Sequence, residues 1–176
     1  SYLVQSPLFC VCDGMGGHAA GEVASSIAVE TIAKTAPQSA DAARLAAAVE
    51  AANAAVIEAA LNGLGKPGMG CTATCAYIEN DTLAIAHVGD SRAYLLHEGT
   101  LIRVTRDHSY VEELVDAGEI TADEARVHPN RSVITRALGS DPAMYADHFT
   151  LHIEEGDRLI LCSDGLSSMI PDSDIE

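Results

Sequence analysis

Positive charge is scarce in this chain. Its 176 residues include 10 lysines and arginines against 26 aspartates and glutamates, which gives a formal net charge of −16 at pH 7. Nucleic acids and anionic membrane surfaces would be repelled by such a chain, so neither is an expected partner.

Long apolar runs are also lacking. No stretch approaches the roughly 18 apolar residues that cross a membrane, and no basic segment followed by an apolar one stands at the start. We therefore expect a soluble, cytoplasmic protein with no membrane contact in this segment.

Cysteine occurs in an odd number, and no two cysteines have the CxxC spacing. This pattern argues against a disulfide framework or a structural zinc site. All five lie in apolar, strand-like stretches, so we expect small buried side chains in a reducing cytoplasm. They are Cys10, Cys12, Cys71, Cys75 and Cys162.

Three of the apolar, strand-like runs lead into an aspartate. These aspartates are Asp13, Asp90 and Asp164, which follow the runs 8–12, 82–89 and 158–162. Carboxylate and carbonyl oxygens are the ligands that Mg²⁺ and Mn²⁺ prefer, and neighbouring glycines let the backbone approach a ligand closely. A single Asp-Gly pair is more often an ordinary turn. Three strand-end aspartates together indicate one cation site.

Helix and strand signals give a coarse order of elements with no linker composition, so we expect a single domain. A helix is predicted from Glu22 to about Ala36, before Pro37, and a second from an N-cap at Ser39 to Gly63. Shorter helices are expected at 109–117 and after the capping box that begins at Thr121. Strands are expected at 71–78, 82–88, 92–96 and 101–104 as an antiparallel meander, and at 149–153 and 158–162 as a last hairpin.

Six motifs occur in the order of a known family. They are DGMGGH at 13–18, GMGCTATCAYI at 68–78, AHVGDSRAYLL at 86–96, RDHSYVEELVDAGEIT at 106–121, HPNRSVITRALG at 128–139 and LILCSDGL at 159–166. Together they resemble the metal-dependent protein serine/threonine phosphatases of the type 2C (PPM) class, in the bacterial branch.

This resemblance implies an α+β fold with two antiparallel β-sheets sandwiched between layers of α-helices. It also implies one domain over residues 1–176, with a flap subdomain at about 106–145 that borders the active site. The implied activity is hydrolysis of phosphoserine and phosphothreonine in proteins by a hydroxide held between two cations. Expected partners are phosphorylated proteins and a cognate serine/threonine kinase, and expected cofactors are two or three Mn²⁺ or Mg²⁺ ions.

The resemblance assigns roles to five residues. Asp13 would bridge two cations, the Gly14 carbonyl would ligate one of them and Asp164 the other. Asp90 would contribute to a third cation; its alternative is a buried structural carboxylate paired with Arg92 or another arginine. His18 would be the general acid, because an ordinary imidazole titrates near neutrality. Its alternative is to cap the helix that begins after Gly21.

The remaining histidines and several flap residues have plainer interpretations. His87 lies in an apolar run and is expected in the core, and Asp141 is expected to form a turn. Arg131 and Arg136 could meet phosphate or form ordinary salt bridges. Surface or turn positions are expected for His97, His108, His128, His148 and His152.

The chain departs from the family pattern at both ends. The family has a phosphate-binding arginine and an Asn-Glu-Asp element upstream and an Asp-Asn element downstream, whereas the first arginine here is Arg44 and none of these elements occurs. We expect an internal portion of a phosphatase domain, with outer strands missing and weak cation binding. A catalytically inactive pseudophosphatase that binds a phosphoprotein or regulator is the alternative, although the presence of Asp13, Gly14, His18 and Asp164 counts against it.

Overall fold

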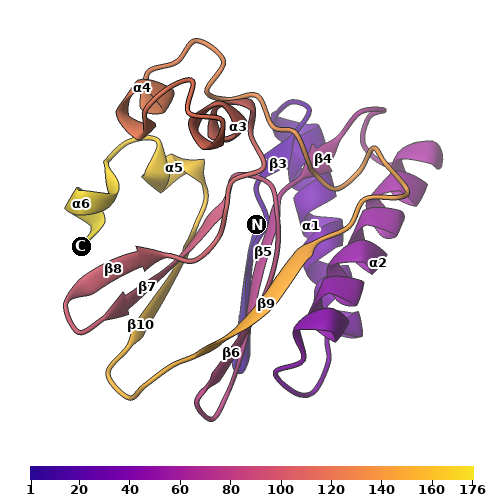
Figure 1. Cartoon of the computed structure of the whole chain (residues 1–176). Coiled ribbons are helices and arrows are strands. Elements are labelled where there is room, and N and C mark those ends of the chain that lie inside the picture. The colour runs from indigo at the N-terminus through magenta and orange to yellow at the C-terminus, as the bar shows by residue number, and fades with distance from the viewer.

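The computed structural model, which describes all 176 residues, has two facing antiparallel sheets with long helices beside them (Figure 1). The first sheet has the order β1 (Tyr2–Gln5), β2 (Leu8–Val11), β5 (Ala73–Glu79), β6 (Thr82–Val88), β9 (Asp147–His152). The second has the order β10 (Arg158–Cys162), β7 (Arg92–His97), β8 (Thr100–Arg103). A short pair joins β3 (Gly14–Met15) to β4 (Gly70–Cys71).

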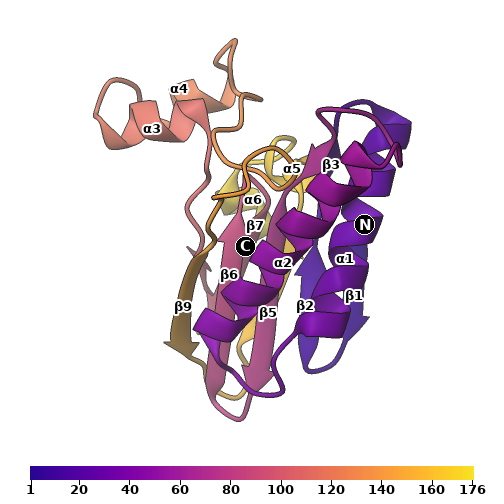
Figure 2. The same cartoon turned by 90° about the vertical axis from the view of Figure 1, so that its right-hand side faces the viewer.

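Two long helices, α1 (His18–Thr35) and α2 (Ala42–Leu61), pack side by side over the outer face of the five-stranded sheet (Figure 2). Their buried faces are rich in alanine, including Ala24, Ala28 and Ala52, and these small side chains let the helices approach the strands closely. The core of 25 buried residues lies between these helices and the sheet. None of the helices combines the length and the apolar character that a membrane span requires.

The boundaries of these helices differ from the sequence prediction. Helix α1 begins at His18, four residues before the expected Glu22. Helix α2 is capped by Asp41, whose side chain accepts a hydrogen bond from the Arg44 backbone N–H, so the N-cap expected at Ser39 is wrong. Both serine and aspartate are good N-caps, and the sequence alone did not separate them.

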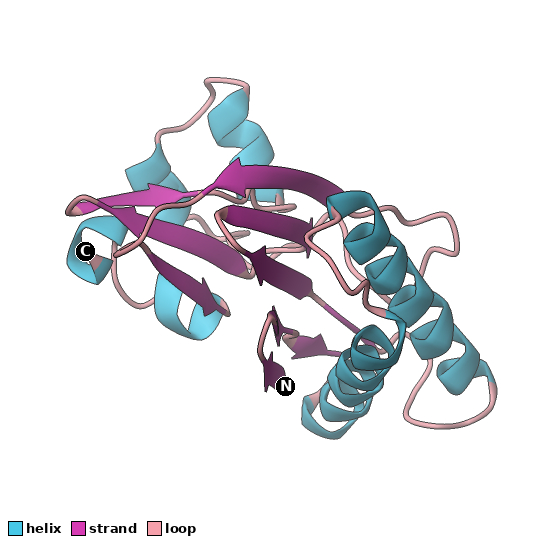
Figure 3. Ribbon diagram, turned by 90° about the horizontal axis from the view of Figure 1, so that it is seen from below, coloured by secondary structure: helices cyan, strands magenta, loops and turns pink.

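A second core fills the space between the two sheets. It is built on Ala76, Leu83, Ile85 and Ala93, which are fully buried. Strand β6 is therefore covered by helices on one face and by the other sheet on the opposite face, which explains why its sequence is almost continuously apolar. Figure 3, a view from below, shows α1 and α2 gathered on one side of the strands. The predicted two-sheet α+β fold is confirmed, with the long helices in one layer.

Strand pairing departs from the sequence prediction in two places. Strands β6 and β7 do not continue a meander, because the chain leaves the five-stranded sheet at 89–91 and enters the other sheet. Strands β9 and β10 do not form a hairpin either: β9 pairs with β6, and β10 pairs with β7. Adjacent strands in the sequence usually pair with each other, and here each connection instead crosses between sheets.

The flap region, 106–145, lies beyond one end of the sandwich (Figure 2). It carries α3 (Tyr110–Asp116), capped by Ser109, and α4 (Ala122–Arg126), which begins with the predicted capping box of Thr121 and Glu124. The one-turn helices α5 (Asp164–Ser167) and α6 (Asp172–Ile175) follow β10.

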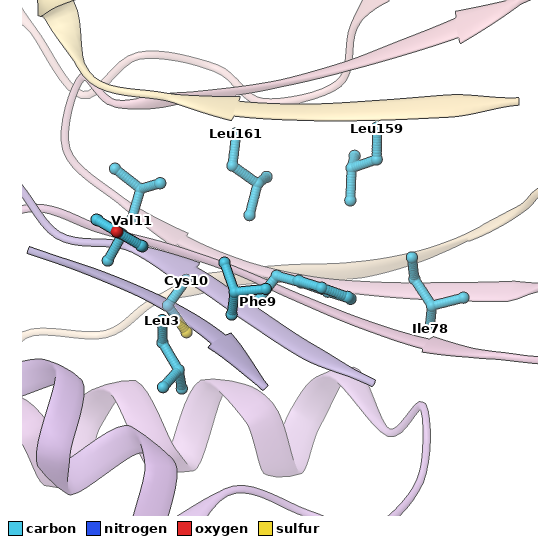
Figure 4. Close-up of a pocket in the computed structure, with 9 residues that line it drawn as sticks. Leu3, Phe9, Cys10, Val11, Ile78, Leu159 and Leu161 are labelled. Carbon is cyan, nitrogen blue, oxygen red and sulfur yellow. The ribbon is translucent and has the colours of Figure 1, made fainter. Parts of the chain in front are cut away.

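An apolar pocket of about 430 Å³ lies between β2 and β10. Figure 4 shows Leu159 and Leu161 of β10 facing Phe9 of β2 across it. All nine lining residues are hydrophobic, so this pocket is separate from the acidic residues identified in the sequence. They are Tyr2, Leu3, Val4, Phe9, Cys10, Val11, Ile78, Leu159 and Leu161.

Candidate active site

The directions of three strands bring the three acidic loops to one end of the sandwich. Strand β6 runs parallel to β2, because each is antiparallel to β5, so Asp13 and Asp90 follow strand ends on the same side. Strand β7 starts from that side and β10 returns to it, which delivers Asp164 there as well. The topology therefore gathers Asp13, Asp90 and Asp164.

These carboxyl groups influence one another's ionisation. Burial raises the pKa of Asp13 to about 6, and the carboxyl group of Asp164 adds to this shift. Burial also raises the pKa of Asp90 to about 6, with further contributions from the negative charges of Asp164, Asp107 and Asp13. None of the three aspartates forms a salt bridge with lysine, arginine or histidine. The cluster thus holds acidic groups without a basic side chain to balance them.

Asp90 gives the most direct structural indication of a cation site. Its Oδ1 atom is buried and has no hydrogen-bond partner. The alternative pairing with Arg92 does not occur, since Arg92 donates to Asp107 at 2.9 and 2.7 Å. A buried carboxylate oxygen without a partner costs free energy, and a divalent cation would satisfy it. The donor set of carboxylate oxygens therefore fits a hard cation such as Mg²⁺ or Mn²⁺.

Gly14 lies where the loop meets helix α1. A Cβ atom at this position would lie 2.0 Å from the carbonyl oxygen of Gly21, which is part of the helix backbone. Only glycine permits this close approach, so the sequence requires Gly14 for the packing of the loop as well as for any role as a ligand.

Thr72 connects two of the acidic loops, and the sequence analysis missed it. The Asp13 N–H donates to Thr72 Oγ1 at 3.0 Å, and the Thr72 N–H donates to the Asp13 carbonyl at 2.9 Å. The Thr72 hydroxyl also hydrogen-bonds Ser91 Oγ at 2.7 Å. Thr72 and Ser91 are fully buried. The sequence signal that could have identified them is a hydroxyl residue placed directly beside an apolar, strand-like run. These two residues fix the loop of Asp13 relative to the loop of Asp90.

His18 is the first residue of α1 and is well exposed. Its side chain is 93% exposed, and Nε2 lies 3.2 Å from Glu22 Oε1. Gly17 is the N-cap and no side chain caps the helix, so the interpretation of His18 as a cap is wrong. The general-acid role of His18 stays a prediction.

Two other histidines are buried near the flap. His87 lies in the core as predicted, where Nδ1 contacts Thr74 Oγ1 and Nε2 contacts the Arg106 carbonyl, each at 3.0 Å. His108 is only 3% exposed, so its interpretation as a surface or turn residue is wrong. A single histidine in a polar segment gave no periodic signal of burial.

Arg131, Arg136 and Asp141, which the sequence analysis named in the flap, each bond other groups of the protein. Arg136 forms a salt bridge with Asp147 at 2.8 Å, and Arg131 donates to the His128 carbonyl. Asp141 accepts from the Ala143 N–H, as expected of a turn residue.

Comparison with known proteins identifies the family. The model of the Protein phosphatase 2C family matches residues 3–175. The serine/threonine phosphatase Stp of Listeria welshimeri is 38% identical over 98% of this chain and 71% of its own length. The serine/threonine protein phosphatase PstP of Mycobacterium tuberculosis is 42% identical over 96% of this chain and 33% of its own length.

Solved structures agree with these relatives. The crystal structure of the Mycobacterium tuberculosis phosphatase PstP/Ppp has a TM-score of 0.91 and 40% identity, and the match covers 98% of this chain and 74% of that one. A structure of the PstP catalytic domain in complex with two manganese ions has a TM-score of 0.88 and 38% identity, covering 99% of this chain and 74% of that one.

The chain belongs to the protein phosphatase 2C family. The class of activity is that of a metal-dependent serine/threonine protein phosphatase, and divalent cations are its cofactors. The sequence predictions of family, fold and enzyme class are confirmed.

Proposed function

We propose that this chain hydrolyses phosphoserine and phosphothreonine in proteins at the end of the sandwich where Asp13, Asp90 and Asp164 meet. The observation that supports this most is the group of three partly buried carboxyls with no basic side chain as partner, one of which has a buried oxygen without a hydrogen bond. A surface with a net charge of −16 would repel a phosphorylated substrate, so catalysis here requires cations at this cluster.

Asp13, the Gly14 carbonyl and Asp164 would hold two divalent cations, and Asp90 would contribute to a third. When bound, these cations lower the pKa of water and neutralise the phosphoryl oxygens. Mn²⁺ and Mg²⁺ are both suitable, because each accepts this set of oxygen ligands.

The protein's remaining task is to supply a proton. Hydrolysis forms a bond from phosphorus to the oxygen of water and breaks the bond from phosphorus to the serine or threonine oxygen, which leaves as an alkoxide unless it is protonated. His18 would donate this proton, since it follows the Asp13 loop directly and its imidazole is exposed.

The proposal extends to the cellular setting. Phosphoproteins made by a serine/threonine kinase are the natural substrates of such an enzyme, so we propose a cognate kinase as its partner. Five reduced cysteines, all buried, fit a cytoplasmic location. Residues 106–145 would act as a flap that borders the substrate site.

An assay with a matched control tests the proposal. The chain, and a version extended by the family's upstream arginine and Asn-Glu-Asp element and its downstream Asp-Asn element, are each given a small aryl phosphate and a phosphothreonine peptide, with Mn²⁺ and with EDTA. We expect Mn²⁺-dependent turnover that Asp13→Asn lowers by more than about 100-fold, because a ligand matters more than its supporting groups. Asp141→Asn, in an exposed turn, should change turnover little.

Two outcomes would reject parts of the proposal. Normal turnover by Asp13→Asn would refute the assigned site. Mn²⁺ binding by calorimetry without turnover of either substrate, in the extended version as well, would instead favour the pseudophosphatase, the alternative in which the site binds but does not catalyse.

A further inference from the structure

We propose that His108, at the start of the flap region, is a positioning residue of the active site: one imidazole nitrogen holds the Gly89 backbone next to Asp90, and the other holds Asp147 of β9, which in turn binds the flap residue Arg136. The proposal rests on the proposed role of Asp90 as a cation ligand. It couples the placement of that ligand to the placement of the flap.

His108 makes two hydrogen bonds with the backbone of Gly89. The Gly89 N–H donates to His108 Nδ1 at 2.9 Å, and the backbone N–H of His108 donates to the Gly89 carbonyl at 2.8 Å. Both polar groups of the Gly89 backbone are therefore bound by one residue. Gly89 follows the last residue of β6, at the point where the chain leaves for the other sheet. Asp90 is the next residue along the chain.

The conformation of Gly89 makes this support necessary. Its φ is +106°, and a Cβ atom would lie 2.6 Å from the Thr72 side chain, so neither the conformation nor the space suits another residue. The following side chain, Asp90, makes no hydrogen bond through its buried Oδ1 and cannot anchor itself by that atom. Its orientation depends on the backbone before it.

The other imidazole nitrogen of His108, Nε2, contacts Asp147. Because Nδ1 accepts from a backbone N–H, it carries no proton, and the neutral ring must carry its proton on Nε2. Nε2 then donates to Asp147 Oδ2 at 2.7 Å. Burial lowers the pKa of His108, which keeps the ring neutral and this arrangement intact.

Asp147 continues the chain of contacts into the flap. Its other oxygen, Oδ1, accepts from Arg136 Nη1 at 2.8 Å. The Arg136 guanidinium stacks over the ring of Tyr145 at 4.3 Å from the centroid and also donates to the Tyr145 carbonyl. Tyr145 is 61% exposed at the end of the flap region. A contact made on Tyr145 or Arg136 can thus move Asp90 through His108 and Gly89.

Two substitutions at His108 separate its two contacts. In His108→Asn, the amide oxygen can take the place of Nδ1 and accept from Gly89, but the side chain is too short to reach Asp147. In His108→Gln, the amide nitrogen can take the place of Nε2 and donate to Asp147, but Gly89 loses its acceptor. His128→Gln is the control, because His128 Nδ1 also accepts from a backbone N–H, that of Asn130, at an exposed site.

Three measurements on the 176-residue chain test the proposal. Amide exchange of Gly89, followed by NMR, should be at least about 10-fold faster in His108→Gln and near wild type in His108→Asn and His128→Gln. Mn²⁺ titration should show about 10-fold weaker binding in His108→Gln only. In His108→Asn, the KM for a phosphothreonine peptide should rise relative to the KM for an aryl phosphate.

Combination with Asp90→Asn provides the decisive check on coupling. If His108 acts through Asp90, His108→Gln should weaken Mn²⁺ binding no further in an Asp90→Asn background. Additive losses, or equal Mn²⁺ binding and Gly89 exchange in the Asn and Gln variants, would overturn the proposal.

The wild-type protein gives a test that does not depend on any variant folding. Its imidazole nitrogen shifts should show an unprotonated Nδ1 and a protonated Nε2 at His108, and the opposite tautomer would overturn the proposal. Absence of Mn²⁺-dependent turnover in the wild type would reject the proposed function, whereas exchange at Gly89 and the tautomer of His108 decide the positioning role independently.

Discussion

Acid should destabilise this fold through the buried His87. Burial, with a smaller contribution from the neighbouring His108, lowers the pKa of His87 to about 4 from 6.5. Between these two values the unfolded chain binds a proton that the folded chain excludes, so the free energy of unfolding falls as the pH falls. Linkage over this interval predicts a loss of about 2 kcal/mol between pH 7 and pH 5 from this side chain alone.

Other groups also change their protonation over this pH range, so the effect of His87 must be measured as a difference between wild type and a variant that lacks the imidazole. Asp107 and Asp147 face His87 and favour its charged form, as the carbonyl of Arg106 does. Asp13 and Asp90 act in the opposite direction, since their raised pKa values make the folded chain bind protons more readily below about pH 6. These carboxyl groups contribute equally to wild type and to a variant at His87, so their effect cancels in the comparison.

The assay is urea unfolding, followed by circular dichroism, of wild type and His87→Gln at pH 7 and pH 5 in EDTA. The glutamine amide can still donate to the Arg106 carbonyl, but it does not titrate. We expect wild type to lose about 2 kcal/mol more than the variant over this interval. Equal losses in the two proteins would refute the account of His87 as a neutral buried imidazole.

Three further substitutions test the packing of the site and the core. Gly14→Ala should lower Mn²⁺ affinity by at least about 10-fold and reduce stability, because its Cβ would lie 2.0 Å from the Gly21 carbonyl oxygen; calorimetry would show an unchanged affinity if this clash were absent. Arg92→Met should cost about 3–5 kcal/mol in urea unfolding, since it leaves Asp107 as a buried carboxylate without its partner. Ile85→Ala, in the core between the sheets, should cost about 2–5 kcal/mol by the same assay, and a cost under 1 kcal/mol would argue against tight packing of the sheets.

The sequence predicted the elements of this fold better than their pairing. Residues 82–88 were predicted as a strand and form β6 with those bounds, because a strand buried on both faces is apolar throughout. The partners of β9 and β10 were wrong, because pairing across the two sheets depends on contacts distant in sequence. No local pattern separates a hairpin from a connection that crosses between sheets.

The sequence also predicted part of the candidate site: the acidic residues at strand ends, but not the residues that hold their loops in place. Asp13, Asp90 and Asp164 follow apolar strands directly, and a carboxylate at a strand end is visible in the sequence. Thr72 and His108 were missed, because each acts through hydrogen bonds to a loop that is distant in the sequence: Thr72 bonds Ser91 at a separation of 19, and His108 bonds Gly89 at a separation of 19. Such contacts are set by the folded chain.

The antiparallel arrangement has a practical consequence for engineering. The turns at Asn80-Asp81 and Glu98-Gly99, together with the loop 153–157, lie at the end of the sandwich opposite the acidic loops. Exposed turns of this kind tolerate inserted sequence better than buried segments do. A fluorescent or affinity module spliced between Glu98 and Gly99 would sit a full strand length from the catalytic chemistry, so the protein could be tracked or captured while its reactive end is left free.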